Sequence, residues 1–335
     1  MLHIKVKDIK DKFFNNALIV LLCFGVVVII IIEPKFLQFR VLKDILTQSS
    51  VKLIVALGLM FPLLTAGTDL SGGRQLGLSA VVVASMMQVA TYPNPFFPNL
   101  PALPVILPIL MALAAVAVCG LINGYMVAWL HLPPFIATLG MSTIVYGANC
   151  IYYNMEPNNA QPIGGIRPEL TILSRYQVFG QMSLLIFIAA FVACFVWFLL
   201  NKTTYGKSIY AAGGNPVAAQ ISGVKVKPIL LSAYIIESLL IGLAGVLEVA
   251  RNSGANSSFG FSYEFDAISA CVVGGVSLSG GVGKVSGVIV GVIIFNVINY
   301  GLTFIGVDPN WQQVFKGLII CMAVALDMRK NAVRT

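Results

Sequence analysis

Charged side chains are scarce in this sequence. Only 10% of the 335 residues are Asp, Glu, Lys or Arg, whereas 58% are hydrophobic, and the mean hydropathy is +0.90. Ordinary globular domains are about 45–50% apolar and about a quarter charged. Between Arg74 and Glu156 no residue carries a charge. These shortages exclude a water-soluble domain and indicate a chain that lies in a lipid bilayer.

Residues that perform chemistry are also rare. His3 and His131 are the only histidines, so no histidine cluster can hold a metal. The six cysteines lie in apolar runs without a Cys-x-x-Cys pair, and we expect them to be small buried side chains. The nearest match to a nucleotide-binding loop, Gly283-Lys284, lacks both the first glycine and the following Ser or Thr. The sequence therefore predicts no enzyme, metal site or cofactor.

Apolar runs recur along the whole chain. A bilayer core needs about 20 mostly apolar residues per helix, so this length allows about ten spans and no additional soluble domain. We therefore expect an all-α, polytopic membrane protein that forms a single domain over residues 1–335. The predicted spans are Ala17–Ile32, Ile45–Ala66, Leu76–Thr91, Pro104–Leu130, Pro134–Tyr153, Ser183–Leu200, Pro228–Ala250, Asp266–Val282, Val285–Ile305 and Trp311–Leu326.

The formal net charge of +8 describes topology rather than nucleic-acid binding, because Lys and Arg concentrate in cytoplasmic loops. Loop 201–227 contains four lysines and no acid, and the tail 328–335 is also basic. Ten spans place both of them and the N-terminal segment 1–16 on the cytoplasmic side. Segments 92–103, 155–182 and 251–263 then face outward. The glycines of Asp266–Val282 leave open whether this span crosses fully or is re-entrant.

Two stretches predict irregular backbone at membrane depth. Gly67–Arg74 is rich in glycine and polar residues and follows Pro62, which should kink the preceding helix. Leu278–Gly281 repeats the four residues Leu70–Gly73. Such backbone survives only where protein or a water-filled cavity satisfies its polar groups. Asp69 in this stretch therefore either borders a transport pathway or caps the next helix with Ser71.

Glu237 lies near the middle of the apolar run that begins at Pro228. A carboxyl group at this depth either faces a pathway or is buried, protonated or hydrogen-bonded. Buried asparagines can line a polar path or hold two helices together. Our candidates for lining the pathway are Asp69, Asn123, Asn149, Asn299 and Glu237. Near the outer end of the same run, Glu248 and Arg251 should form an ion pair.

The basic loop contains a short helix with clear capping signals. Asn215 is a good N-cap, Pro216 suits the first helical position, and Gly223 suits a left-handed C-terminal stop. Val217, Ile221 and Val224 give this helix one apolar side. That side needs a cover, which is either the bilayer surface or a groove on a partner.

Several motifs resemble one family almost from end to end: the membrane permease subunits of bacterial ATP-binding-cassette sugar importers that serve ribose, xylose and galactose. The motifs that carry the resemblance are Gly67–Ser71, Gly120–Gly124, Pro134–Gly140 and Gly213–Gly223. The segments Ile45–Ser50, Ala270–Ser277 and Asn299–Pro309 look most similar to the galactose/methyl-galactoside subgroup. Glu237 departs from the resemblance, because we expect a small residue there.

The resemblance implies a homodimeric pore in the bacterial inner membrane. A periplasmic sugar-binding protein would dock outside, and a cytoplasmic ATP-binding subunit would dock inside and bind the ATP. The loop helix would then be the coupling helix that contacts the ATPase. Its residues are Gly213, Asn215, Pro216, Val217, Ala218, Ala219, Ile221 and Gly223.

Two alternatives stay open. The cargo could be another sugar, such as ribose or xylose, instead of galactose or methyl galactoside. The chain could also be an ion-coupled secondary transporter that uses Asp69, Arg74 or Glu237 as its ion or proton site. Such a carrier works alone and would need no docking helix.

Overall fold

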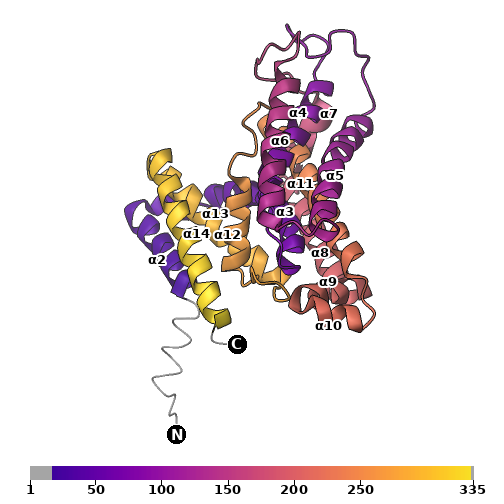
Figure 1. The fold of residues 1–335 in the computed structure, drawn as a ribbon. Helices are drawn as coiled ribbons and strands as arrows, with labels where there is room; N and C mark the ends of the chain where they lie inside the picture. Colours follow the sequence, from indigo (N-terminus) through magenta and orange to yellow (C-terminus); the bar gives the residue numbers. More distant parts are fainter. Residues whose placement is uncertain (1–16, 333–335) are drawn as a thin grey trace.

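The structure, a computed structural model, describes residues 17–332, so the predicted cytoplasmic segment 1–16 and residues 333–335 of the tail lie outside the described part. Most of the described chain is helical, as predicted (Figure 1). One small hairpin, β1 (Gln177–Val178) with β2 (Met182–Ser183), lies in a predicted outer segment. The helices are α2 (Ala17–Ile32), the 3-10 helix η1 (Pro34–Leu37), α3 (Phe39–Leu64), α4 (Gly72–Met86), α5 (Ile106–Ala128), α6 (Pro134–Asn154), α7 (Pro168–Arg175), α8 (Leu184–Lys202), α9 (Thr204–Gly214), α10 (Pro216–Ile221), α11 (Val226–Asn252), α12 (Tyr263–Val273), α13 (Val285–Phe304) and α14 (Pro309–Ala332).

Six of these helices, α3, α5, α6, α8, α11 and α13, are long and apolar enough to cross a membrane. The other four predicted spans coincide with α2, α4, α12 and α14. Helices α2 and α4 have 16 and 15 residues, and α12 has only 11. A count of ten spans is therefore consistent with the helices but is not established by their lengths.

The predicted span Asp266–Val282 is helical only in its first half. Helix α12 ends at Val273, and an irregular stretch connects it to α13. At one end of this segment, the Tyr263 hydroxyl donates to Glu248 near the C-terminus of α11 (2.9 Å). At the other end, the Gly281 N–H donates to the carbonyl of Leu64 at the C-terminus of α3 (2.9 Å). These two contacts place the segment between the C-terminal end of α11 and the C-terminal end of α3.

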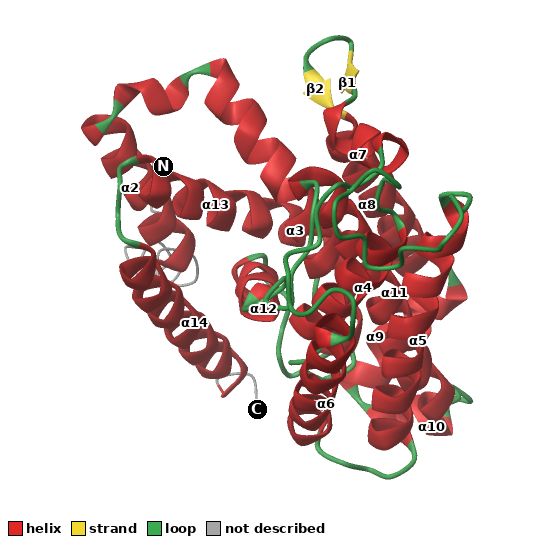
Figure 2. Ribbon diagram, turned by 90° about the horizontal axis from the view of Figure 1, so that it is seen from above, coloured by secondary structure: helices red, strands yellow, loops and turns green. Residues whose placement is uncertain are grey.

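Helix α3 lies at the centre of the molecule. Helices α2, α12, α13 and α14 lie on one side of it, and α4, α5, α6 and α11 lie on the other (Figure 2). From Ile54 to Leu64 the α3 side chains are fully buried, and the largest apolar cluster joins them to side chains of α8, α11, α12 and α13. The cysteine prediction is only partly right. Cys119 and Cys271 are buried, whereas Cys194 and Cys321 are exposed because they lie on outward faces of α8 and α14.

Small residues bring α5 and α11 into close contact. A Cβ atom at Gly120 would lie 2.6 Å from the carbonyl oxygen of Tyr234, and one at Gly124 would lie 2.9 Å from Cα of Leu231. Lipid chains are as apolar as leucine, so helices in a bilayer associate through such close packing rather than through the hydrophobic effect. The pairs of glycines four residues apart are therefore packing positions.

Three chain segments that are distant in sequence assemble at one end of the molecule. Gln88 pairs with Ile166, and Ile163 pairs with Ala255, as isolated antiparallel bridges. Arg167 also donates to the carbonyl of Leu103 (2.7 Å). Helix α10 and the ends of the described chain lie at the opposite end (Figure 1). This arrangement agrees with the predicted division between outer segments and the basic loop.

We expect Gly120→Ala to lower the stability of the protein by about 2 kcal/mol, because the new methyl group would meet the α11 backbone. Gly140→Ala in α6 is the matched control, since a Cβ atom there meets nothing within 4 Å. Thermal unfolding of both purified variants in the same detergent measures the difference. Equal melting temperatures would contradict this account of the α5–α11 contact.

Candidate functional site

A buried polar network surrounds Asp69, in the break between α3 and α4. Its carboxylate is fully buried and accepts hydrogen bonds from the Ser71 N–H (2.5 Å), the Ser71 hydroxyl (2.6 Å) and Nδ2 of Asn123 on α5 (3.0 Å). The Ser71 hydroxyl in turn accepts from Nε2 of Gln75 (2.9 Å). The carboxylate therefore satisfies the backbone at the break and ties it to α5.

The alternative role of Asp69 and Ser71 as helix caps is wrong. Ser71 occupies the N-cap position of α4 but makes no capping hydrogen bond with its side chain. Its hydroxyl is committed to Asp69, Gln75 and Asn123. The tertiary network thus outcompetes the local cap, because a buried carboxylate without donors costs more than a helix N–H group without an acceptor.

Glu237 approaches this network from α11. Its side chain is fully buried, and its Oε1 atom lies 3.8 Å from the position of a Cβ atom at Gly72, the first residue of α4. Neither of its carboxyl oxygens has a hydrogen-bond partner among the described residues. Glu237 therefore occupies the position of the expected small residue without a hydrogen-bonded or cationic partner in the described part of the chain.

Three further side chains complete the surroundings of Asp69 and Glu237. Gln75, Tyr234 and Ser238 are fully buried, and each has one side-chain polar atom without a partner among the described residues. Tyr234 lies at the α3–α4 break, since a Cβ atom at Gly67 would be 2.6 Å from its hydroxyl. The result is a polar region in the interior of a membrane protein, which is where functional groups concentrate.

Only part of the predicted set of pathway residues comes together. Asp69 and Asn123 are hydrogen-bonded in the network, and Glu237 lies beside it. Asn149 is buried on α6, and its Nδ2 atom instead faces Gly77 of α4. Asn299 lies on α13, on the other side of α3. These two asparagines lie outside the network, and the contact of α6 with the break is made instead by Thr138, which accepts from the Leu70 N–H (3.1 Å) and donates to the Thr68 carbonyl (3.1 Å).

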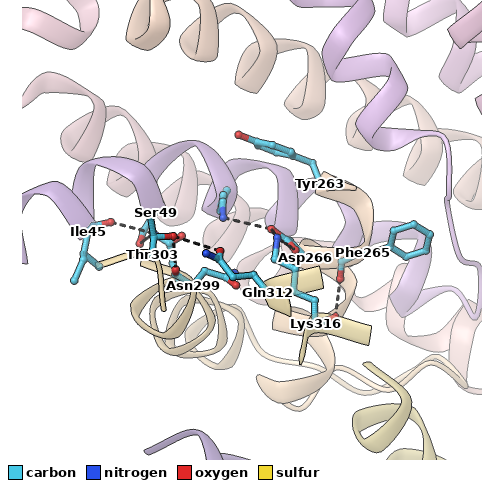
Figure 3. A network of polar contacts seen from close by, with 12 residues as sticks. Ile45, Ser49, Tyr263, Phe265, Asp266, Asn299, Thr303, Gln312 and Lys316 are labelled. Carbon is cyan, nitrogen blue, oxygen red and sulfur yellow. Dashed lines mark hydrogen bonds and ion pairs between the residues drawn. The ribbon is translucent and has the colours of Figure 1, made fainter. Parts of the chain in front are cut away.

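Sequence reasoning missed a second polar group, between α3, α12 and α14. Asp266 forms ion pairs with Lys52 (3.3 Å) and Lys316 (3.0 Å), and all three side chains are largely buried (Figure 3). Nearby, Asn296 on α13 donates to Ser49 of α3 (2.8 Å). The available signal was the single lysine in each of two otherwise apolar spans, because such charges need a partner.

The capping chemistry of the predicted coupling segment is confirmed. Oδ1 of Asn215 accepts from the Ala218 N–H (2.9 Å), Pro216 begins α10, and Gly223 has a left-handed φ of +87°. Val217 and Ile221 are 66% and 83% exposed, so their apolar side has no cover within the described chain.

The other face of this segment packs inward. Ala219 is buried, whereas Ala218 is exposed. Gly213, in the last turn of α9, lies so close to Leu64 of α3 that a Cβ atom would overlap the Leu64 carbonyl. This segment therefore has one side fixed to the membrane domain and one side left open.

The predicted ion pair at the end of α11 is also confirmed. Arg251 donates to Glu248 at 2.6 Å. The same carboxylate accepts from the Tyr263 hydroxyl (2.9 Å) and from Nδ2 of Asn252 (2.9 Å). These bonds hold the end of α11 against the start of α12.

Known proteins are similar to this chain over nearly its whole length. The family model described as branched-chain amino acid transport system / permease component matches residues 41–324. The galactose/methyl galactoside import permease protein of Escherichia coli (strain K12) is 48% identical over 95% of both chains. Its counterpart in Haemophilus influenzae is 46% identical over 96% of this chain and 98% of its own. The ribose import permease protein of Bacillus subtilis is 36% identical over 92% and 90%. No solved structure matches the chain significantly.

We expect Asp69→Asn to destabilise the protein by about 3 kcal/mol, because an amide presents an N–H₂ group where the network supplies donors. Glu237→Gln is the matched comparison. Its amide has the size of the carboxyl group, and the carboxyl oxygens have no hydrogen bond among the described residues to lose, so stability and transport should stay near wild type. Thermal unfolding in detergent, followed by uptake measurements, separates the two variants. A large loss of transport in Glu237→Gln alone would assign the Glu237 carboxyl group an active role.

Proposed function

Because the chain belongs to the family of permease components of bacterial ATP-binding-cassette importers, we propose that it forms the path by which galactose and methyl galactoside cross the inner membrane. The observation that carries this proposal is the open apolar side of α10, at Val217 and Ile221. A membrane protein that transports alone has no need of such a surface in a loop. The permease supplies the gate, and a separate cytoplasmic subunit hydrolyses ATP.

Galactose is favoured over other sugars by the degree of similarity. The galactose/methyl galactoside permeases of two bacteria are 46% and 48% identical to this chain, whereas a ribose permease is 36% identical. Ribose or xylose is the second candidate cargo.

The partners follow from the two ends of the molecule. Helix α10 presents its apolar side to the ATP-binding subunit at the cytoplasmic end, where both termini also lie. The surface built from segments 92–103, 155–182 and 251–263 is where a periplasmic sugar-binding protein docks. Two copies of the chain enclose the pore between them.

A junction of three backbone segments links α10 to the polar network. Gly281 donates to the Leu64 carbonyl, and a Cβ atom at Gly280 would lie 2.8 Å from both the Ala66 nitrogen and the Gly213 carbonyl oxygen. The Tyr210 hydroxyl also donates to the carbonyl of Gly283 (2.9 Å). Main chain touching main chain leaves no flexible side chain to absorb a displacement.

This junction gives the coupling helix a mechanical route into the membrane. When nucleotide binding closes the ATPase, α10 moves, and the last turn of α9 moves with it. Displacement of Leu64 then shifts the break that begins at Thr65 and carries Asp69. Asn123 ties the break to α5, and Tyr234 of α11 packs against it at Gly67, so a movement of α10 repositions two membrane-spanning helices.

Reconstitution tests the proposed function. Proteoliposomes that contain the permease, the candidate ATPase and the candidate binding protein should take up radiolabelled galactose only when all three components and ATP are present. Uptake by the permease alone, abolished when the ion gradient is collapsed, would make the chain a secondary transporter. Uptake of ribose or xylose but not galactose would retain the class and change the cargo.

Co-purification of the ATPase with the permease tests docking on α10. Ile221→Asp should prevent co-purification of the ATPase, because it places a charge in the centre of the apolar side without touching the inward-packed residues. Gln220→Asp, also exposed on α10 but outside the apolar side, is the control and should assemble normally. Normal assembly of Ile221→Asp would refute the docking assignment.

Coupling through the junction predicts a contrast between adjacent glycines. Gly213→Ala should lower ATP-driven uptake by about tenfold while the ATPase remains bound, because its methyl group pushes α9 away from Leu64. Gly214→Ala should transport normally, since the nearest atom to its Cβ is 4.0 Å away. Uptake and co-purification are measured on the same preparations. Normal uptake by Gly213→Ala would rule out coupling through this contact.

A further inference from the structure

A pocket of about 600 Å³ opens at the end of the molecule opposite α10. We call it the outer vestibule. Its volume lies within the range of about 300–1,000 Å³ that is typical of small-molecule sites. It is built from the loop after α4, the loop after α6 and the segment that joins α11 to α12. Residues at its wall include Tyr92, Glu248, Asn252, Ser258, Phe261 and Tyr263.

The outer vestibule is polar but carries no net charge. Glu248 is the one ionisable acid or base at its wall, and Arg251 neutralises it at 2.6 Å. Tyr263 and Asn252 also donate to this carboxylate. A site for a metal ion or an anionic substrate would leave a charge uncompensated, so the wall suits a neutral, hydroxyl-rich ligand.

Aromatic rings supply the apolar part of the wall. The Phe261 ring is 60% exposed and is braced by the Arg74 guanidinium, which lies 5.1 Å from its centroid and 4.3 Å from that of Tyr146. Tyr92 lies on the opposite loop and packs against the backbone of Gly165. A pyranose ring has an apolar C–H face and an edge of hydroxyl groups, so it can use the rings and the amides together.

Tyr263 forms the inner limit of the outer vestibule. The same residue lines a neighbouring cavity with Lys52 and Asp266, and that cavity measures only about 10 Å³. Such a space holds at most one water molecule. At Tyr263 the outer vestibule therefore meets a space too small for a sugar, and we expect the passage toward the membrane interior to be closed there.

We propose that the outer vestibule is a binding site in the permease itself for galactose and methyl galactoside, filled as the sugar leaves the binding protein. The inference rests on the proposed function and deepens it. The permease then adds a second sugar-recognition step to that of the binding protein, and Tyr263 stands between the bound sugar and the closed passage.

Equilibrium binding of radiolabelled methyl galactoside to the purified permease–ATPase complex, without the binding protein, tests this site directly. The wild-type complex should bind at millimolar concentration. Ser258→Trp should weaken binding by about tenfold or more, because an exposed serine at the wall becomes a side chain that fills the pocket. Thr91→Trp is the matched control, since Thr91 is exposed beside Tyr92 but does not line the pocket, and it should bind like wild type.

A second measurement separates sugar binding from docking of the binding protein. Ser258 also lies in segment 251–263 of the proposed docking surface, so two activities of Ser258→Trp are compared. Galactose uptake should fall by a similar factor, whereas the stimulation of ATP hydrolysis by the sugar-loaded binding protein should fall less than twofold. Loss of that stimulation would make the pocket a contact for the binding protein and overturn the proposal. Methyl galactoside binding by Ser258→Trp at wild-type strength, or no binding by the wild type, would overturn it as well. Wild-type proteoliposomes that transport no galactose would instead refute the proposed function.

Discussion

The absence of water inside a bilayer is the constraint on which the rest of this structure depends. Every backbone N–H and C=O group at membrane depth needs a partner within the protein, and helices meet that need by themselves. The chain leaves helical geometry at two places within the bundle, after Leu64 and after Val273. At the first break, the Asp69 carboxylate accepts from the N–H of Ser71. The Leu64 carbonyl accepts from the N–H of Gly281, which belongs to the second irregular stretch. The irregular stretches are possible because they pair with each other and with buried side chains.

That solution also explains why the functional features are connected. The stretch after α12 and the break after α3 meet at one junction, where Gly213 of the coupling segment joins them. A helix that must be moved from outside the membrane is thereby attached to the least regular backbone inside it. Breaks of this kind deform more readily than continuous helices, because fewer hydrogen bonds oppose the change. In the proposed mechanism, ATP-driven motion of α10 therefore reaches the break without first bending a long helix.

The two polar regions have different roles in the proposed transport cycle. Asp69 and Glu237 are fully buried in the half of the molecule that contains α4, α5 and α11, where Asp69 holds the break against Asn123 of α5. The outer vestibule lies at the opposite end from α10 and is open, with the Lys52–Asp266–Lys316 cluster just below it. We assign positioning to the first region and contact with sugar to the second. This differs from the expectation that Asp69 and Glu237 themselves line the path.

Sequence alone determined what depends on neighbouring residues. Apolar runs placed the long helices, and Asn215, Pro216 and Gly223 defined α10, because capping involves atoms only a few residues apart. Sequence alone did not predict which residues of distant helices are in contact. Asp69 bonds to Asn123 across 54 residues, and Asp266 pairs with Lys52 and Lys316, while Asn149 and Asn299 lie elsewhere. Only the tertiary structure decided these partners, because the rotation and register of packed helices select which polar groups meet, and a single apolar span is compatible with many such choices.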